Sequence, residues 1–68
     1  MKPDEIRVGQ VLQGKGTDAC FTREVLSINE KRREAVTLVY RSGKFIGEGL
    51  PMSLMALARW TAHEVVRP

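Results

Sequence analysis

Few residues of this 68-residue chain could do chemistry, and none stands with the partners that such chemistry needs. His63 is the only histidine, and Cys20 is the only cysteine. A general base or a metal ligand needs further polar groups nearby, and the adjacent Glu64 would point to the opposite face of a strand. We interpret His63 as an exposed strand residue and Cys20 as a small, inert residue, although a cation such as Arg23 could stabilise its thiolate. We therefore predict no enzyme activity, no catalytic residue, no metal ligand and no cofactor.

The segment Gly14–Thr17, Gly-Lys-Gly-Thr, has the composition of a phosphate-binding loop without its spacing. The nucleotide-binding loop has four residues between its first glycine and the Gly-Lys pair, and a helix follows it. Here a single lysine separates the two glycines, and strand-forming residues follow from Phe21 onwards. We interpret the segment as a flexible loop.

Basic side chains raise the question of nucleic-acid binding. The chain has 11 Lys and Arg against 8 Asp and Glu, which gives a net charge of +3. Such side chains contact phosphates. The candidate nucleic-acid contacts are Lys31, Arg32, Arg33, Arg41 and Lys44. Glu30 and Glu34 bracket the densest run, and nucleic-acid barrels usually interleave exposed aromatic residues, of which Phe45 is the one clear candidate. A solvated turn is favoured, and nucleic-acid binding is kept as the alternative.

Tight turns separate several apolar segments and predict a meander of strands. Each segment is rich in β-branched or aromatic residues and is bounded by glycine, asparagine or charged residues. In the second segment, Leu26 and Ile28 fall on one face of a strand, whereas Phe21 and Val25 fall on the other. This pattern indicates a bulge or a coiled strand that is buried on both sides. The predicted strands cover residues 6–12, 21–29, 35–40 and 45–50.

The stretch 50–60, Leu-Pro-Met-Ser-Leu-Met-Ala-Leu-Ala-Arg-Trp, is the only part of the chain with a helical pattern. Ser53 has the side chain of a typical N-cap. Leu54 and Leu57 are three residues apart and share one face of a helix. We predict a short helical turn from Ser53 to Arg59.

Two alternatives stay open for the C-terminal segment, residues 61–67. A fifth strand is favoured, because Val65 and Val66 are β-branched and their stiffness lowers helix propensity. The segment could instead extend the helix, because helical spacing is kept by Leu50, Leu54, Leu57, Thr61 and Val65.

Four meandering strands, a short helical turn and a fifth strand resemble the plan of the Src-homology-3-like barrel. Val8–Val11 resembles the first strand of such barrels. Leu54–Val66, with Trp60 before the last strand, resembles the closing segment of short uncharacterised proteins of phages and mobile gene cassettes. The resemblance implies a single all-β domain over residues 1–68, a five-stranded barrel in which residues 1–5 form a polar, frayed lead.

The plasmid-borne, trimethoprim-resistant dihydrofolate reductases share this plan and nearly this size. Their pore carries a Val-Gln-Ile-Tyr run. The nearest run here, Thr37–Tyr40, lacks the glutamine whose amide meets the ligands. The resemblance therefore does not extend to this activity.

The small size of the chain limits what can stabilise it. A chain of this length buries only about 60% of its unfolded surface. Cys20 has no second cysteine for a disulfide, so packing or self-association must stabilise the fold. Met1–Glu5 is polar and lacks a signal peptide, and no apolar run approaches the roughly 18 residues that span a bilayer. With a free thiol, this predicts a cytoplasmic protein.

Both faces of the central strands carry apolar residues, whereas a small barrel has one interior. We place in the interior Val36, Leu38, Tyr40, Leu26, Ile28 and Leu57. Val25, Val39 and Phe45 then face outward and form a candidate interaction surface. The alternative is that coiling of the barrel buries them. The predicted function is a non-catalytic binding or adaptor module that self-associates or binds an unknown protein partner.

Overall fold

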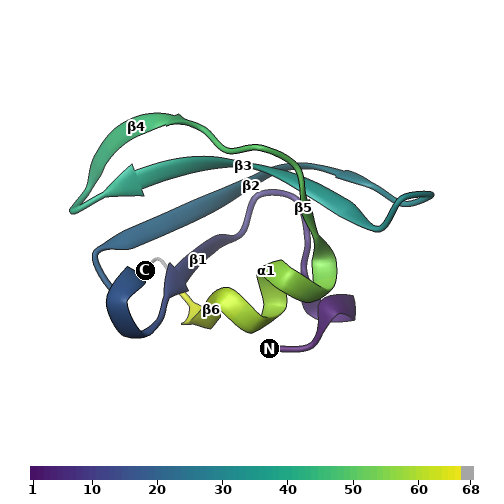
Figure 1. Ribbon diagram of the computed structural model, residues 1–68, viewed down its shortest axis with the longest axis horizontal. Coiled ribbons are helices and arrows are strands. Elements are labelled where there is room, and N and C mark those ends of the chain that lie inside the picture. The colour runs from purple at the N-terminus through teal and green to yellow at the C-terminus, as the bar shows by residue number, and fades with distance from the viewer. Residues whose placement is uncertain (67–68) are drawn as a thin grey trace.

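The computed structural model describes residues 1–66 of the 68-residue chain. It is a small, mostly-β fold with a single α-helix in the described part (Figure 1). In chain order the elements are the 3₁₀ turn η1 (Pro3–Glu5), β1 (Val11–Gly14), the 3₁₀ turn η2 (Gly16–Asp18), β2 (Phe21–Asn29), β3 (Glu34–Arg41), β4 (Lys44–Glu48), β5 (Met52–Ser53), α1 (Leu54–Trp60) and β6 (Thr61–Glu64).

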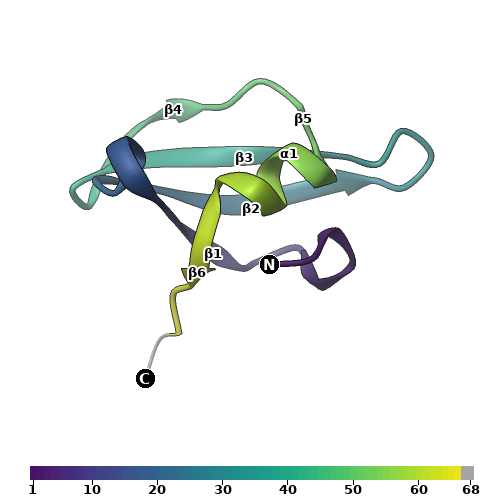
Figure 2. The same ribbon diagram turned by 60° about the horizontal axis from the view of Figure 1, so that its bottom comes forward.

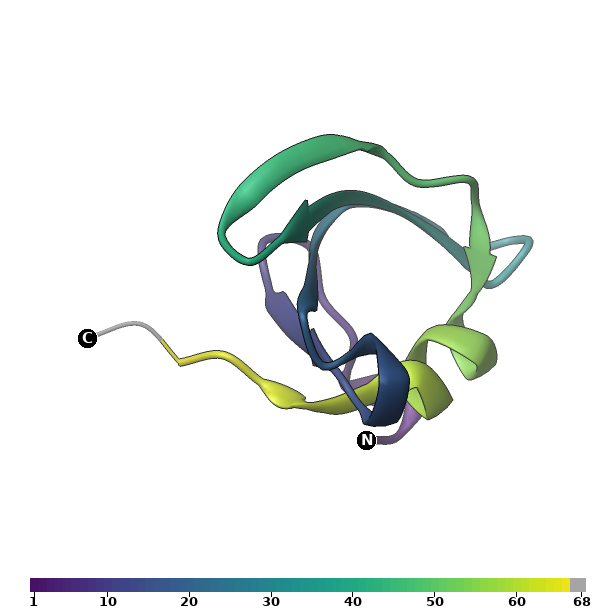
Figure 3. The same cartoon turned by 60° about the vertical axis from the view of Figure 1, so that its left-hand side comes forward.

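One antiparallel sheet holds all six strands, in the order β4-β3-β2-β1-β6. The edge of β3 that faces away from β2 pairs with β4 at one end and with the short β5 at the other. The sheet curls into a partial ring, and α1 lies on its rim between β5 and β6, as Figure 3 shows. No strand pairing in the described residues joins β4 to β6, so the sheet is open. The prediction of a small all-β fold is confirmed, whereas a closed barrel is not formed by strand pairing.

The core lies between the concave side of the sheet and α1. Figures 1 and 2 show α1 and η1 on the same side of the sheet, and the two elements contact each other. The buried apolar side chains are Ile6, Leu12, Val25, Ala35, Leu54, Leu57 and Ala58. Burying this set on one side leaves the convex side of β2, β3 and β4 without a covering layer.

The predicted assignment of strand faces is partly wrong. In β3 the buried residues are Ala35 and Thr37, so Val36, Leu38 and Tyr40 lie on the convex side instead of in the interior. The inner positions of β3 face α1, where small side chains leave room for its leucines. Ile28 and Leu57 do pack in the core, as predicted.

A β-bulge in β2 explains the second part of this correction. The register shifts between Val25 and Ser27, so Leu26 is an extra residue without a partner. The predicted bulge is thus confirmed, but its effect is the reverse of what we expected. Val25 is 1% exposed and Leu26 is 46% exposed. One inserted residue moves the following side chains to the other face.

The helix begins as predicted and ends one residue later. The hydroxyl of Ser53 accepts a hydrogen bond from the Ala56 amide at 3.0 Å and caps α1. Thr61 starts β6, and its hydroxyl donates to the Leu57 carbonyl at 2.7 Å. This bond satisfies a carbonyl at the helix end. The strand alternative is therefore confirmed for Thr61–Glu64, and residue 67 of the predicted strand lies outside the described residues.

The first predicted strand begins later than expected. Two turns occupy the preceding residues: η1, and a left-handed turn at Gly9 with φ of 93°. Ile6 lies between these turns and is buried in the core. β1 therefore covers Val11–Gly14 instead of residues 6–12.

Candidate interaction surface

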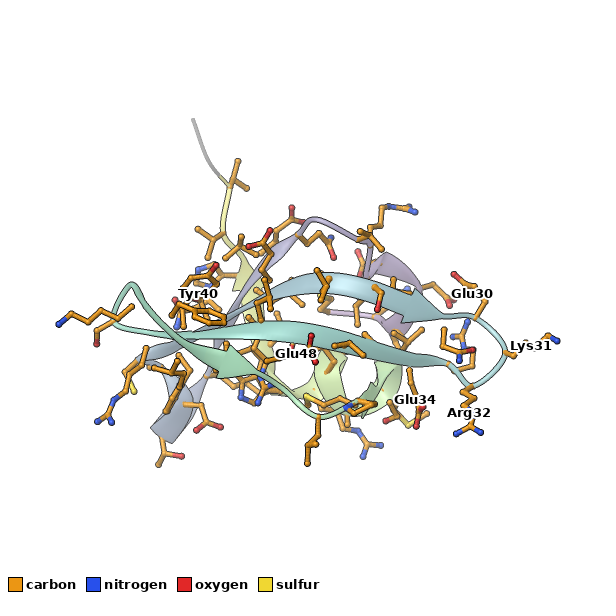
Figure 4. The ribbon with its side chains drawn as sticks, turned by 90° about the horizontal axis from the view of Figure 1, so that it is seen from above. Glu30, Lys31, Arg32, Glu34, Tyr40 and Glu48 are labelled. Atoms are coloured by element: carbon orange, nitrogen blue, oxygen red, sulfur yellow. The ribbon has the colours of Figure 1, made fainter. Side chains whose placement is uncertain are left out.

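The convex side of β2, β3 and β4 presents side chains that no other element covers in residues 1–66. Figure 4 looks onto this side, with α1 behind the sheet. Alternation along the strands and cross-strand pairing define its members. We call the outer face the set Val11, Gln13, Thr22, Glu24, Ser27, Asn29, Glu34, Val36, Leu38, Tyr40, Phe45 and Glu48, together with the exposed bulge residue Leu26.

Apolar side chains form the middle of the outer face. Val36 and Leu38 are half-buried in β3. The next outward residue, Tyr40, meets the ring of Phe45 on β4 edge-on, with 5.6 Å between ring centroids and 64° between planes. Phe45 is 58% exposed. The result is a continuous apolar strip that remains open to solvent.

A shallow hollow lies at one end of this strip. It has a volume of about 220 Å³ and is lined by Val11, Thr22, Tyr40 and Gly43. Sites for small ligands typically measure about 300 to 1,000 Å³. The hollow is therefore sized for a side chain of a partner rather than for a cofactor.

Carboxylates flank the apolar strip on both sides. Leu38 pairs across the sheet with Glu24 on β2 and with Glu48 on β4. Glu34 lies on the same face toward the β2–β3 turn, as the labels in Figure 4 show. The described residues form one ion pair, Arg33 with Asp4, and it lies elsewhere. The outer face thus combines apolar area with carboxylates that have no ion-pair partner in residues 1–66.

The structure brings one of the three predicted surface residues to the outer face. Phe45 is there, as expected. Val25 is buried beneath β2, so its predicted outward orientation is wrong. Val39 is half-buried on the concave side, where it faces Gly49. The bulge at Leu26 causes the error for β2, and the inward position of Thr37 determines that of Val39.

The predicted nucleic-acid contacts form two separate groups. Lys31, Arg32 and Arg33 lie around the β2–β3 turn, where Figure 4 labels the first two. Arg41 and Lys44 flank the β3–β4 turn, at the other end of β3. Those eight residues of β3 extend over roughly 25 Å. The chain therefore does not gather these five side chains into a single basic patch.

Two of these cations already have neighbours within the chain. The guanidinium of Arg33 donates to an Asp4 carboxylate oxygen at 3.0 Å. The guanidinium carbon of Arg41 lies 5.8 Å from the centroid of the Phe21 ring. Lys31 and Arg32 are exposed, as is Lys44.

A polar cluster that no sequence pattern predicted lies on the concave side of the sheet. Arg23 donates to the Thr37 hydroxyl at 3.0 Å, and its guanidinium lies 5.0 Å from the centre of the Trp60 ring. The Trp60 indole donates to Asp18 at 3.0 Å. Burial lowers the pKa of Arg23, and the negative charge of Asp18 acts in the opposite direction. These residues are distant in sequence, so no local pattern identifies them.

The close packing of this cluster favours a structural role. A side chain at Gly14 would place its Cβ 2.6 Å from the Trp60 ring and 2.4 Å from the Asp18 carbonyl oxygen. Likewise, a Cβ at Gly49 would lie 2.7 Å from the Arg23 guanidinium. There is no free space for a ligand at these positions. The cluster joins β2 and β3 to the end of α1 on the concave side.

A larger hollow lies near the start of α1. It has a volume of about 360 Å³ and is lined by Pro3, Arg32, Arg33, Ser53, Leu54 and Met55. Its cationic rim would suit an acidic ligand. However, Asp4 of the same chain already binds Arg33. The hollow is therefore a weaker candidate than the outer face.

The other chemical candidates remain isolated. Cys20 is exposed and unpaired with any other cysteine of the chain. His63 is exposed on β6, opposite Gln13. Within residues 1–66, no three side chains of His, Cys, Asp or Glu gather as a metal site would require. The Gly-Lys-Gly-Thr segment runs from the last residue of β1 into the 3₁₀ turn η2, and the strand β2 follows, so a nucleotide-binding helix does not follow it.

Comparison with known proteins adds no relative: no protein-family model, curated protein or solved structure matches this chain. α1 has seven residues, and the described residues contain no helix with the length and apolarity to cross a membrane. Function must therefore be argued from the outer face.

Proposed function

We propose that this protein is a non-catalytic binding module that takes a protein partner on its outer face. One observation carries the proposal: the outward positions of β3 are Val36, Leu38 and Tyr40, extended by Phe45 on β4, and no element of the described chain covers them. An antiparallel sheet with one solvated face usually places polar residues there. Contiguous apolar area on such a face is typical of an interaction site.

The size of the molecule supports use of the whole face. A typical partner covers about 800 Å² of a protein. The described chain exposes 4741 Å², so such a footprint takes about one sixth of its surface. Scattered single residues would not supply this area, whereas a face that extends over β2, β3 and β4 can.

We further propose that the fold is an open member of the Src-homology-3-like barrels, acting in the cytoplasm. The support is the order of elements: a four-stranded meander, a short helix, and a last strand that returns to pair with β1. The exposed free thiol of Cys20 supports a reducing compartment. Self-association stays a prediction, and a second copy is one of the partners that the tests below distinguish.

Selection of a displayed random-peptide library against the full chain tests the binding function. We expect selected peptides to bind at least about tenfold more weakly after Phe45→Ser, because exposed aromatic residues often dominate interfaces. Met55→Ser is the matched control, because Met55 is 56% exposed, compared with 58% for Phe45, and lies on α1. A selection that yields no binder, or binders that respond equally to both substitutions, would contradict the proposal.

A further inference from the structure

We infer that the outer face binds a positively charged amphipathic helix with two lysines or arginines about 10 Å apart. This inference rests on the proposed function and specifies its partner. Glu24 and Glu48 both pair with Leu38 across the sheet, one on each side. Two carboxylates therefore flank one apolar side chain at the centre of the surface.

The spacing of the carboxylates sets the spacing of the partner's cations. Neighbouring strands lie about 4.8 Å apart, so Glu24 and Glu48 are separated by about 10 Å at their Cα atoms. On an α-helix, residues i and i+7 share a face and lie about 10.5 Å apart. An apolar residue between them would meet Leu38. On an extended strand, residues at a comparable distance, i and i+3, point to opposite faces.

The charge on the outer face is opposite to that of the whole molecule. The chain carries a net charge of +3, yet the charged side chains of the outer face are the carboxylates of Glu24, Glu34 and Glu48. Apart from Arg23, whose guanidinium lies on the concave side of the sheet against Thr37, the nearby cations flank the turns at the two ends of β3. They lie roughly 10 Å or more along the strand from Leu38, and charges at such distances are largely screened at physiological salt. A helix laid on the centre of the face meets the carboxylates first.

The free-energy cost of removing water from these carboxylates makes a neutral apolar partner a poorer fit than a cationic one. A neutral partner that covers Glu24, which is already half-buried, would remove water from its charge without supplying a compensating ion pair. A lysine or arginine opposite each carboxylate restores a partner. The exposed ring of Phe45 adds a further surface for a cation.

The same argument disfavours a second copy of this chain on the outer face. In a symmetric face-to-face pair centred on Leu38, each carboxylate of one copy would meet a carboxylate of the other, because Glu24 and Glu48 lie on either side of the centre. Like charges placed opposite each other are destabilising. The cationic helix is therefore the occupant that the charge pattern favours.

Three synthetic helices of about 18 residues test the inference with the full-length chain. All share the same apolar residues. The first has lysines at i and i+7, the second has glutamates there, and the third has lysines at i and i+5, which point to different faces. We expect the first to bind at least about tenfold more tightly than the other two, with an advantage that shrinks as salt is raised.

Two variants connect this advantage to the outer face. The double substitution Glu24→Gln and Glu48→Gln keeps side-chain shape and should abolish the preference for lysine; circular dichroism checks that the fold is unchanged. Phe45→Ser should weaken binding of all three helices. Tighter binding of the glutamate helix, or a lysine preference that survives the double substitution, would overturn the inference.

The outcomes separate the inference from the proposed function. If display selection yields peptides that depend on Phe45 but the lysine helix has no advantage, the binding module stands and its cationic partner is rejected. If no binding depends on Phe45, both are rejected. Sedimentation that shows a dimer dissociated by Phe45→Ser would also overturn the inference, because a second copy would then occupy the face.

Discussion

The concave and convex sides of the sheet differ in whether their polar side chains find partners within the chain. On the concave side, Arg23, Thr37 and Trp60 are held by hydrogen bonds and a ring contact within the chain. On the convex side, Leu38 and Tyr40 are flanked by carboxylates without an ion-pair partner in residues 1–66. The concave groups bond mostly to one another, with only the Nε of Arg23 buried and unpartnered, whereas the carboxylates of the outer face remain free to select a partner. This difference directs the search for function to the outer face.

Two valines give the strongest test of which face is which. Val25→Ala should lower the free energy of unfolding by about 2–3 kcal/mol, because it empties a buried site. Val36→Ala should lower it by less, by about 1 kcal/mol, because that side chain is already partly exposed. Urea unfolding followed by circular dichroism measures both. Equal losses, or a larger loss at Val36, would reverse the assignment of the faces.

The concave cluster should respond to loss of its indole hydrogen bond. Trp60→Phe should cost about 1.5 kcal/mol of unfolding free energy, because the indole donates to the charged Asp18 carboxylate. Asp18→Ala removes the same bond from its other end. In a double-mutant cycle the two losses should not add. Full additivity would show that the bond contributes nothing, and would weaken the distinction between a concave side held by internal hydrogen bonds and an open outer face.

A smaller effect is expected where α1 begins beneath the sheet. Ser53→Ala should cost about 1 kcal/mol, because the Ala56 amide loses its capping oxygen. Ser53→Asn is the control and should retain most of the stability, since asparagine caps as well as serine. Thermal unfolding of the three proteins checks the order. If asparagine were as harmful as alanine, packing at Ser53 rather than capping would position the helix.

The smallest effect should be seen with nucleic acid. Because the basic residues form two groups at opposite ends of β3, one duplex contacts the two or three cations of one group. We expect weak binding, with a slope of log affinity against log salt of about −2. Fluorescence anisotropy with nonspecific DNA measures this slope. A slope steeper than about −4 would mean that both groups bind together, and would shift the functional site away from the outer face.

Local signals predicted β2, β3 and α1 closely, whereas β1 begins five residues later than predicted and β5 was not predicted. The bounds of β2 and the Ser53 cap follow from turn and capping residues, which act over a few positions. β5 has two residues and depends on pairing with β3, so no local pattern announces it. The faces were misassigned at Leu26, because one unpaired residue reverses a two-residue alternation.

The candidate site was harder to predict than the fold. Phe45 was placed outward by the same face assignment that wrongly put Tyr40 in the interior, although the two residues pair across the sheet and share the outer face. The arrangement of Glu24, Leu38 and Glu48 depends on register across three strands, which the sequence does not specify by itself. The contact between Arg23 and Trp60 likewise joins residues that only the fold brings together.

The bulge at Leu26 has a genetic consequence. Val25 and Ser27 already pair with the adjacent residues Thr37 and Val36, so removal of the intervening codon would leave both sets of pairs intact. Such a deletion yields a regular strand with less twist. Removal of any other single codon of β2 would have to be absorbed by a new shift of register. Leu26 is thus the one residue of β2 whose deletion would keep all other side chains of the strand on their present faces of the sheet.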